Sequence, residues 1–154
     1  MRFVTPLSLA VAFAAGIAVS PLAQRLLPSA QAQAAGLTPM IIDIAAIREA
    51  DLPTTPNPDL RAKGLVATEQ ATIAVQMGNV GKRFHTDANE IQYIVEGTGT
   101  AWLGDKKVEI RPGMLVIIPK GTHHAGTESM GGSRFKALAI KIPPQAPTDA
   151  TFVN

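Results

Sequence analysis

The sequence predicts an all-β fold in which short strands form a barrel. From Glu69 onward, apolar side chains recur at every second position in several segments, which is the period of a half-buried strand. Glycines and prolines separate these segments at short intervals, and almost no stretch has the period of a helix. With 154 residues, 46% of them apolar and 17% charged, the chain suits one domain with a core.

The first 34 residues predict an export signal. Arg2 precedes a mostly apolar run from Phe3 to Val19, and the small residues of Ala30–Ala34 offer A-x-A cleavage sites after Ala32 or after Ala34. We therefore expect residues 1–34 to be removed and the mature protein to be periplasmic or secreted. Because the apolar run nearly spans a bilayer, an uncleaved membrane anchor is the alternative, and we expect membrane contact only through such a leader.

The charge balance argues against a nucleic-acid partner. The chain has 14 Lys and Arg against 12 Asp and Glu. Two of the basic residues, Arg2 and Arg25, lie in the leader, so the remaining 12 basic and 12 acidic residues cancel. A surface without excess positive charge gives no electrostatic reason to bind nucleic acid. The absence of cysteine excludes disulfides and thiolate metal ligands.

Residues 35–64 are expected to form an N-terminal arm and loop that pack on the barrel. Met40–Ile44 predicts a short strand, and Ala45–Ala50 predicts a turn of helix. The segment Pro53–Leu60 contains three prolines, which interrupt both helices and strands, so it is expected to be a loop.

The barrel itself is expected over residues 65–142, followed by an extended C-terminal tail over residues 143–154. Its predicted strands are Glu69–Met77, Glu90–Glu96, Thr98–Leu103, Lys106–Ile110, Met114–Ile118 and Arg134–Ile142. Turns at Gly97, at Gly104-Asp105 and at Arg111–Gly113 join several of them. The continuous apolar run Met114–Ile118 predicts a strand that is covered on both faces.

Two motifs in this region carry a family resemblance. The first has the spacing H-x4-E-x6-G and consists of His85, Glu90 and Gly97. The second has the spacing G-x5-P-x-G-x2-H and consists of Gly113, Pro119, Gly121 and His124. Together they resemble the paired motifs of the cupin family, and the resemblance covers roughly residues 65–142. It implies a double-stranded β-helix, a jelly-roll-like barrel, and a homodimer.

The resemblance also implies a metal site. In metal-binding cupins the ion is held by two histidines two residues apart, a glutamate and a histidine of the second motif. His85, Glu90 and His124 match the last three places, whereas Arg83 occupies the first. Arginine has no lone pair to offer a metal. The two histidines and one carboxylate that remain still suit a divalent ion of Fe, Mn, Zn, Ni or Cu with open coordination positions.

Four further residues are candidates for the same site. Arg83 and Gln92 each lie two residues from a predicted ligand and therefore share its face in an extended strand. We expect both to contact a small, anionic organic molecule. Asp87 is an additional candidate, either as a replacement oxygen ligand or as the acid or base of a reaction. His123 is the next candidate for such an acid or base. The residues alone do not identify a catalytic group.

Two functions follow from these candidates. The first is a small metal-dependent cupin enzyme, an oxidoreductase, lyase or isomerase that acts on a small anionic molecule. The second is a non-catalytic binding or sensor protein without metal, in which Arg83 pairs with Glu90 across the cavity. A guanidinium fixed about 4–5 Å from a divalent ion repels it by several kcal/mol at an effective dielectric of about 20. Metal binding is therefore expected only if Arg83 turns outward or binds an anionic substrate at a distance from the ion.

Overall fold

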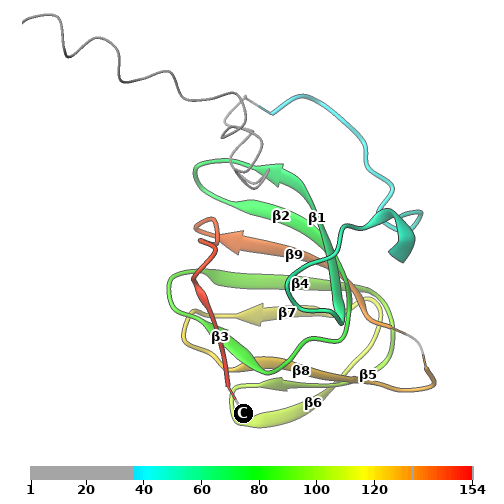
Figure 1. The fold of residues 1–154 in the computed structure, drawn as a ribbon, viewed down its shortest axis with the longest axis vertical. Coiled ribbons are helices and arrows are strands. Elements are labelled where there is room, and N and C mark those ends of the chain that lie inside the picture. The colour runs from blue at the N-terminus through cyan, green and yellow to red at the C-terminus, as the bar shows by residue number, and fades with distance from the viewer. Residues whose placement is uncertain (1–36, 133, 154) are drawn as a thin grey trace, which may run out of the picture. The chain divides into compact units, whose positions relative to one another are not determined.

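The structure is a computed structural model that describes residues 37–132 and 134–153. The predicted export signal, residues 1–34, lies outside the described residues. In the described part of the chain, the strands form two antiparallel five-stranded sheets with the orders β1-β2-β9-β4-β7 and β10-β3-β8-β5-β6 (Figure 1). From β7 to β10 the chain passes to the opposite sheet at each step, which confirms the predicted all-β, double-stranded β-helix fold.

The strands of both sheets are short, as the spacing of glycines and prolines indicates. The first sheet consists of β1 (Leu60–Ala67), β2 (Thr72–Gly78), β9 (Lys136–Ile142), β4 (Asn89–Glu96) and β7 (Leu115–Ile118). The second consists of β10 (Ala150–Phe152), β3 (Arg83–His85), β8 (His124–Ser129), β5 (Gly99–Leu103) and β6 (Lys106–Ile110). A short 3-10 helix, η3 (Glu49–Asp51), precedes β1. No helix of the described residues is long and apolar enough to cross a membrane.

The interior between the sheets changes from polar to apolar along β4. Its inward side chains are Glu90, Gln92 and Ile94 in order, of which Glu90 is 0% and Ile94 2% exposed. Near Ile94, an apolar cluster forms around the buried residues Ala101, Ile110 and Phe135. The polar part of the interior lies around Glu90 and contains the predicted metal ligands.

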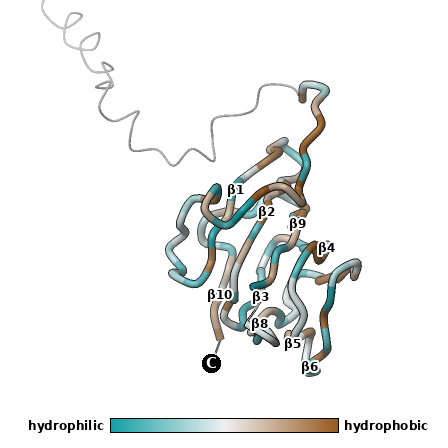
Figure 2. The backbone as a smooth tube through the Cα atoms, turned by 90° about the vertical axis from the view of Figure 1, so that its right-hand side faces the viewer, coloured by the Kyte–Doolittle hydropathy of each residue, from teal (hydrophilic) through white to brown (hydrophobic). Residues whose placement is uncertain are grey.

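The barrel extends beyond the predicted bounds of residues 65–142 at both ends. Strand β1 begins at Leu60 and pairs with β2, and β10 lies in the segment expected to be an extended tail. Figure 2 shows β10 beside β3, with which it forms an antiparallel pair. The pairing of β10 with β3 joins segments that are far apart in the sequence, and each has only three residues, too few to display a strand period of its own.

Two element predictions are wrong. Met40–Ile44 is not a strand, because this apolar segment forms no β-pairing with any other described residue; a turn at residues 44–46 and η3 follow it. The second concerns β7, which was expected to be covered on both faces. Leu115 and Ile117 are 60% and 55% exposed, because β7 is the edge of its sheet and its outward side chains have no covering layer among the described residues.

Candidate metal centre

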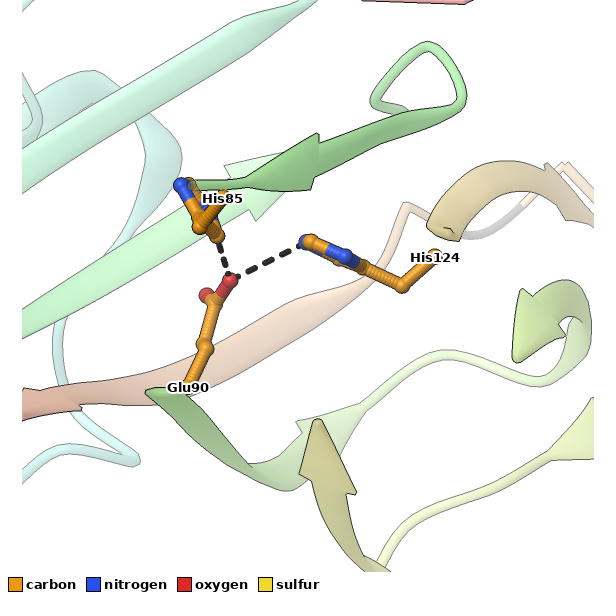
Figure 3. Close-up of side chains that lie close together, drawn as sticks. All are labelled: His85, Glu90 and His124. Atoms are coloured by element: carbon orange, nitrogen blue, oxygen red, sulfur yellow. Dashed lines mark hydrogen bonds and ion pairs between the residues drawn. The ribbon is translucent and has the colours of Figure 1, made fainter. Parts of the chain in front are cut away.

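Three strands bring the predicted ligands together in the barrel. His85 ends β3, Glu90 lies near the start of β4, and His124 begins β8. One ligand atom from each lies within 4.8 Å of the others, and all three side chains are buried. Figure 3 shows the two imidazole rings pointing toward the same carboxylate oxygen of Glu90. This oxygen, Oε2, lies 3.0 Å from His85 Nε2 and 3.2 Å from His124 Nε2.

Backbone pairing fixes these three positions. Arg83 pairs with His124 between β3 and β8, so the two motif histidines come from adjacent strands. The Gly121 N–H donates to the carbonyl of His85 at 2.7 Å, which holds the loop before β8 against the end of β3. Gly121 has φ +76°, and no atom lies within 4 Å of the place a Cβ would occupy. The motif glycine is therefore required by backbone conformation, and not by crowding.

The hydrogen bond of His124 determines which of its ring nitrogens carries a proton. Its Nδ1 lies 2.9 Å from the carbonyl oxygen of Thr122. A carbonyl oxygen accepts and cannot donate, so Nδ1 is the protonated nitrogen. In the neutral ring, Nε2 then carries a lone pair. This buried atom has no hydrogen-bond partner among the described residues, although it faces Glu90 Oε2.

His85 is held in a similar way by a carboxylate that the sequence did not suggest. Its Nδ1 lies 3.2 Å from Asp149 Oδ2, and the Asp149 side chain is fully buried. The two atoms are within hydrogen-bonding distance but are not well aligned, and neither has another hydrogen-bond partner in the described part of the chain. With the Nδ1 proton directed toward Asp149, the Nε2 lone pair of a neutral ring also faces Glu90.

Two lone pairs and a carboxylate oxygen therefore converge without a proton between them. This arrangement is repulsive unless each ring carries a second proton or a cation accepts all three donors. A metal ion with ligand distances of about 2.0–2.2 Å separates adjacent ligand atoms by about 2.8–3.1 Å in octahedral geometry and by about 3.3–3.6 Å in tetrahedral geometry. The separations of 3.0 Å and 3.2 Å lie within the span of these two geometries. The donor set thus fits a divalent ion.

Glu90 is a carboxylate in spite of its burial. Burial alone would raise its pKa, but in the metal-free protein two effects hold the pKa well below its ordinary value: the hydrogen bonds that His124 and His85 donate when a second proton occupies each Nε2, and the charges of Lys141 and Arg83. Its second oxygen, Oε1, accepts a hydrogen bond from Gln92 Nε2 at 2.9 Å. The same oxygen lies 3.8 Å from Lys141 Nζ, which also contacts the side-chain oxygen of Gln145.

Arg83 turns inward, into the position on which the two functional hypotheses differ. It is 4% exposed, and its Nη2 lies 3.9 Å from Glu90 Oε2. Burial lowers the pKa of Arg83 and the charge of Glu90 opposes this shift, but an arginine remains charged in either case. Arg83 and Gln92 line an interior cavity of about 30 Å³. A neighbouring cavity of about 20 Å³ is lined by Gln92 and His124.

The two additional candidates lie outside this cluster. Asp87 is exposed, because β3 ends at His85 and the chain no longer alternates there. His123 diverges from His124 and packs against the ring of Phe84, with the ring centroids 5.5 Å apart.

Sequence reasoning missed two buried charges at the site, Lys141 and Asp149. Lys141 could have been found, since it falls on the inward alternation of the last predicted strand, together with Ala137 and Ala139. Asp149 could not, since it lies among Pro, Thr and Ala residues in a segment without a strand period.

Comparison with known proteins agrees with this architecture. Residues 71–141 match the family model described as a cupin domain. An uncharacterized protein of Methanocaldococcus jannaschii is 35% identical over 70 residues, which are 46% of this chain. The match spans 55% of the length of that curated relative.

Solved structures share the fold at low sequence identity. An uncharacterized conserved protein with a double-stranded β-helix domain from Klebsiella pneumoniae has a TM-score of 0.58 and 12% identity, over 76% of this chain and 99% of that chain. Streptomyces Pac13, solved with uridine, has a TM-score of 0.56 and 16% identity, over 70% of this chain and 88% of that chain. KdgF from Halomonas sp. has a TM-score of 0.51 and 18% identity, over 60% of this chain and 86% of that chain.

Proposed function

The chain carries a cupin domain, and from this premise we propose that it binds a divalent metal ion through His85, Glu90 and His124 and acts on a small anionic organic molecule. One observation carries the proposal. Two buried imidazole Nε2 atoms, each with its Nδ1 facing an acceptor, converge on the single oxygen Glu90 Oε2. Three donors arranged in this way are the ligands that Fe, Mn, Zn, Ni or Cu accept, with positions left for a substrate.

When bound, the ion would supply Lewis-acid or oxygen-activating chemistry to a substrate that reaches it. The protein supplies the remaining functions. Glu90 and the two histidines hold the ion, while Arg83 and Gln92 line the adjoining cavity and orient the substrate. The buried setting limits water at the site and strengthens each of these charge interactions.

The charges of the site favour an anionic substrate. The buried cations Arg83 and Lys141 are balanced by Glu90 and Asp149, so the four charges sum to zero. A divalent ion adds two positive charges to this buried region and is repelled by Arg83. An anion placed between the ion and Arg83 compensates both, and its oxygens can accept the guanidinium donors. The cavities hold only about one to two water-sized groups each, which suits a molecule of a few heavy atoms.

The solved neighbours do not select a substrate. Pac13 is described as a nucleoside dehydratase and was solved with uridine, but at 15–16% identity it shares the fold with this chain and not a demonstrated activity. The proposal therefore names a chemical class, a small organic acid, on the basis of Arg83 and the charge balance.

A second candidate function rests on the inward position of Arg83. Its 3.9 Å separation from Glu90 Oε2 is the ion pair expected in a non-catalytic, metal-free binding protein or sensor. In that protein both histidines would carry two protons, and the organic anion would bind to Arg83 alone. The two candidates differ in whether metal is required for anion binding.

Cobalt provides a direct test, because its visible absorption reports on its coordination. The Co²⁺-loaded protein is titrated with a panel of carboxylates of about one to four carbons and with the matching uncharged amides. We expect at least one carboxylate to change the Co²⁺ spectrum in a saturable manner, and the amides to have no effect. Carboxylate binding that is equally tight with and without metal would favour the second candidate and contradict the first.

We also propose that the protein is exported and forms a homodimer. Export is supported by the apolar leader that follows Arg2, and it is tested by fractionating the native host and measuring the mass of the mature chain. A chain that is found in the cytoplasmic fraction and retains residues 1–34 would contradict export.

The proposed homodimer is supported by exposed apolar side chains on the outer face of β4 and of the edge strand β7. These side chains are Tyr93, Leu115 and Ile117.

A further inference from the structure

The last strand of the chain is part of the metal centre. Strand β10 lies beside β3, which carries Arg83 and His85 (Figure 2). In this antiparallel pair Ala150 lies opposite His85 and Phe152 opposite Arg83. Asp149 directly precedes this pair and therefore reaches the end of β3 where His85 enters the barrel. A segment that the sequence presents as a tail thus supplies a buried acidic group beside a predicted ligand.

Asp149 is held firmly in this position. Its Oδ1 accepts a hydrogen bond from the Asp87 N–H at 2.7 Å, and its carbonyl accepts one from the Thr86 N–H at 3.2 Å. Its own N–H donates to the carbonyl of Ala146 at 3.1 Å. These bonds fix the carboxylate and leave Oδ2 within hydrogen-bonding distance of His85 Nδ1, at 3.2 Å. Burying a carboxylate is costly unless polar groups compensate it, which indicates that the contact with His85 has a role.

We propose that Asp149 is a positioning residue that holds His85 in the form with Nδ1 protonated, so that the Nε2 lone pair is free for a divalent metal ion. A neutral imidazole has one donor and one acceptor nitrogen, and a carboxylate beside Nδ1 selects that nitrogen as the donor. The negative charge also makes Nε2 a stronger electron-pair donor. Carboxylates placed in this way behind a metal-binding histidine commonly change metal affinity by about 10- to 100-fold.

The site then has two different supports for its two histidines. Thr122 presents a neutral carbonyl oxygen to His124, at 2.9 Å from Nδ1, whereas Asp149 presents a charge to His85. Loss of the charge should therefore weaken the His85 side of the site while His124 and Glu90 keep their positions. This inference rests on the proposed metal site and adds that the C-terminal strand completes it.

The test compares the zinc affinity of the full mature chain with that of two variants, by competition against a chromophoric chelator. Asp149→Asn keeps the shape and removes the charge, and Asp105→Asn in the exposed turn between β5 and β6 is the matched control. We expect Asp149→Asn to bind zinc about 10- to 100-fold more weakly and Asp105→Asn to bind it like the parent chain. Equal affinity of a folded Asp149→Asn variant overturns the inference but leaves the proposed metal site intact.

A second measurement needs no variant of Asp149. Nitrogen-15 chemical shifts of the histidine rings in the zinc-loaded parent chain report which nitrogen is protonated and which binds metal. We expect His85 to show a protonated Nδ1 and a metal-bound Nε2, and zinc bound through His85 Nδ1 would overturn the inference. A parent chain that takes up no zinc or other divalent ion would overturn the proposed metal site and this inference together.

Discussion

Arg83 Nη2 lies 3.9 Å from Glu90 Oε2 inside the barrel, where the two residues are 4% and 0% exposed. This separation is too long for a hydrogen bond, so the guanidinium acts on the carboxylate through its charge. The same oxygen is the point at which the two imidazoles converge. A cation therefore occupies the place that the cupin resemblance assigns to a further histidine, and in the proposed metal site it would couple metal binding to the charge of whatever fills the adjoining cavity.

Replacing the Arg83 charge should change metal and anion binding in opposite directions. In Arg83→Gln, the repulsion between the guanidinium and a divalent ion is removed, so zinc affinity should rise at least about tenfold. Carboxylate binding to the metal-loaded protein should be lost or severely weakened, since the charged donors are gone. Isothermal titration with zinc and then with carboxylate measures both effects. Arg111→Gln removes an exposed cation and is the control; unchanged zinc affinity in Arg83→Gln would show that Arg83 does not act on the ion.

Neutralising Glu90 should destabilise the metal-free barrel. Glu90→Gln keeps the side-chain shape but leaves Arg83 and Lys141 without the charge that both face. Breaking a buried ion pair by removing one partner typically costs about 3–5 kcal/mol of folding free energy. Urea unfolding followed by circular dichroism measures the loss, with Glu109→Gln, a change of an exposed side chain of β6, as the control. Equal stabilities of the two variants would mean that the buried cations do not depend on Glu90.

The stability of the metal-free protein should fall in acid because of Glu90. Its pKa in the folded state is well below the ordinary value of 4.5, so its contribution is fully present above that pH and is lost as the pH falls toward the lowered pKa. The free energy of unfolding should therefore decrease below about pH 4.5, and the decrease should be smaller in Glu90→Gln. Arg48, chiefly by a side-chain hydrogen bond, also lowers the pKa of Asp51 to about 2, but this surface effect is common to both proteins. Parallel pH profiles of the two proteins would contradict the assignment.

A charge on the outer face of β7 should disrupt the proposed homodimer. Leu115 and Ile117 are 60% and 55% exposed, and they lie opposite Tyr93 and Ile91 of β4 on the same face. Burying two lysines in a sheet-to-sheet contact is strongly unfavourable, so Leu115→Lys/Ile117→Lys should be monomeric where the parent chain is dimeric. Light scattering after gel filtration measures the mass. A control double variant, Lys106→Glu/Lys107→Glu, changes two exposed side chains of β6 and should remain dimeric. A parent chain that is monomeric would contradict the homodimer itself.

The parts of the fold that the sequence could predict are those in which local pattern and structure agree. Strand β6 has the predicted bounds Lys106–Ile110, and β4 begins one residue before the predicted Glu90, because alternation and glycine turns define both. Strands β3 and β10 have three residues each and exist through long-range pairing, so no local pattern reveals them. The exposure of β7 was missed for a related reason, since an apolar run does not show whether a neighbouring layer covers it.

The residues of the candidate site likewise fall into those that a local sequence pattern predicts and those that only the tertiary structure brings in. Motif spacing places His85, Glu90 and His124 together, and strand alternation adds Gln92 and Arg83. Strand alternation wrongly places Asp87 on the same face as Arg83 and His85, because β3 ends at His85, two residues earlier. Asp149 enters the site only through the pairing of β10 with β3, so its role depends on tertiary structure and not on any signal within residues 143–154.

The central claim is that His85, Glu90 and His124 hold a metal ion, and elemental analysis of the mature protein tests it most directly. The chain from about residue 35 onward is purified without a metal-binding tag and loaded in turn with Fe, Mn, Zn, Ni and Cu. We predict about one equivalent of a divalent ion, which is lost in His124→Ala and retained in His123→Ala, whose ring packs against Phe84 outside the cluster. No bound ion in the parent chain, or a full equivalent retained by His124→Ala, would contradict the metal site.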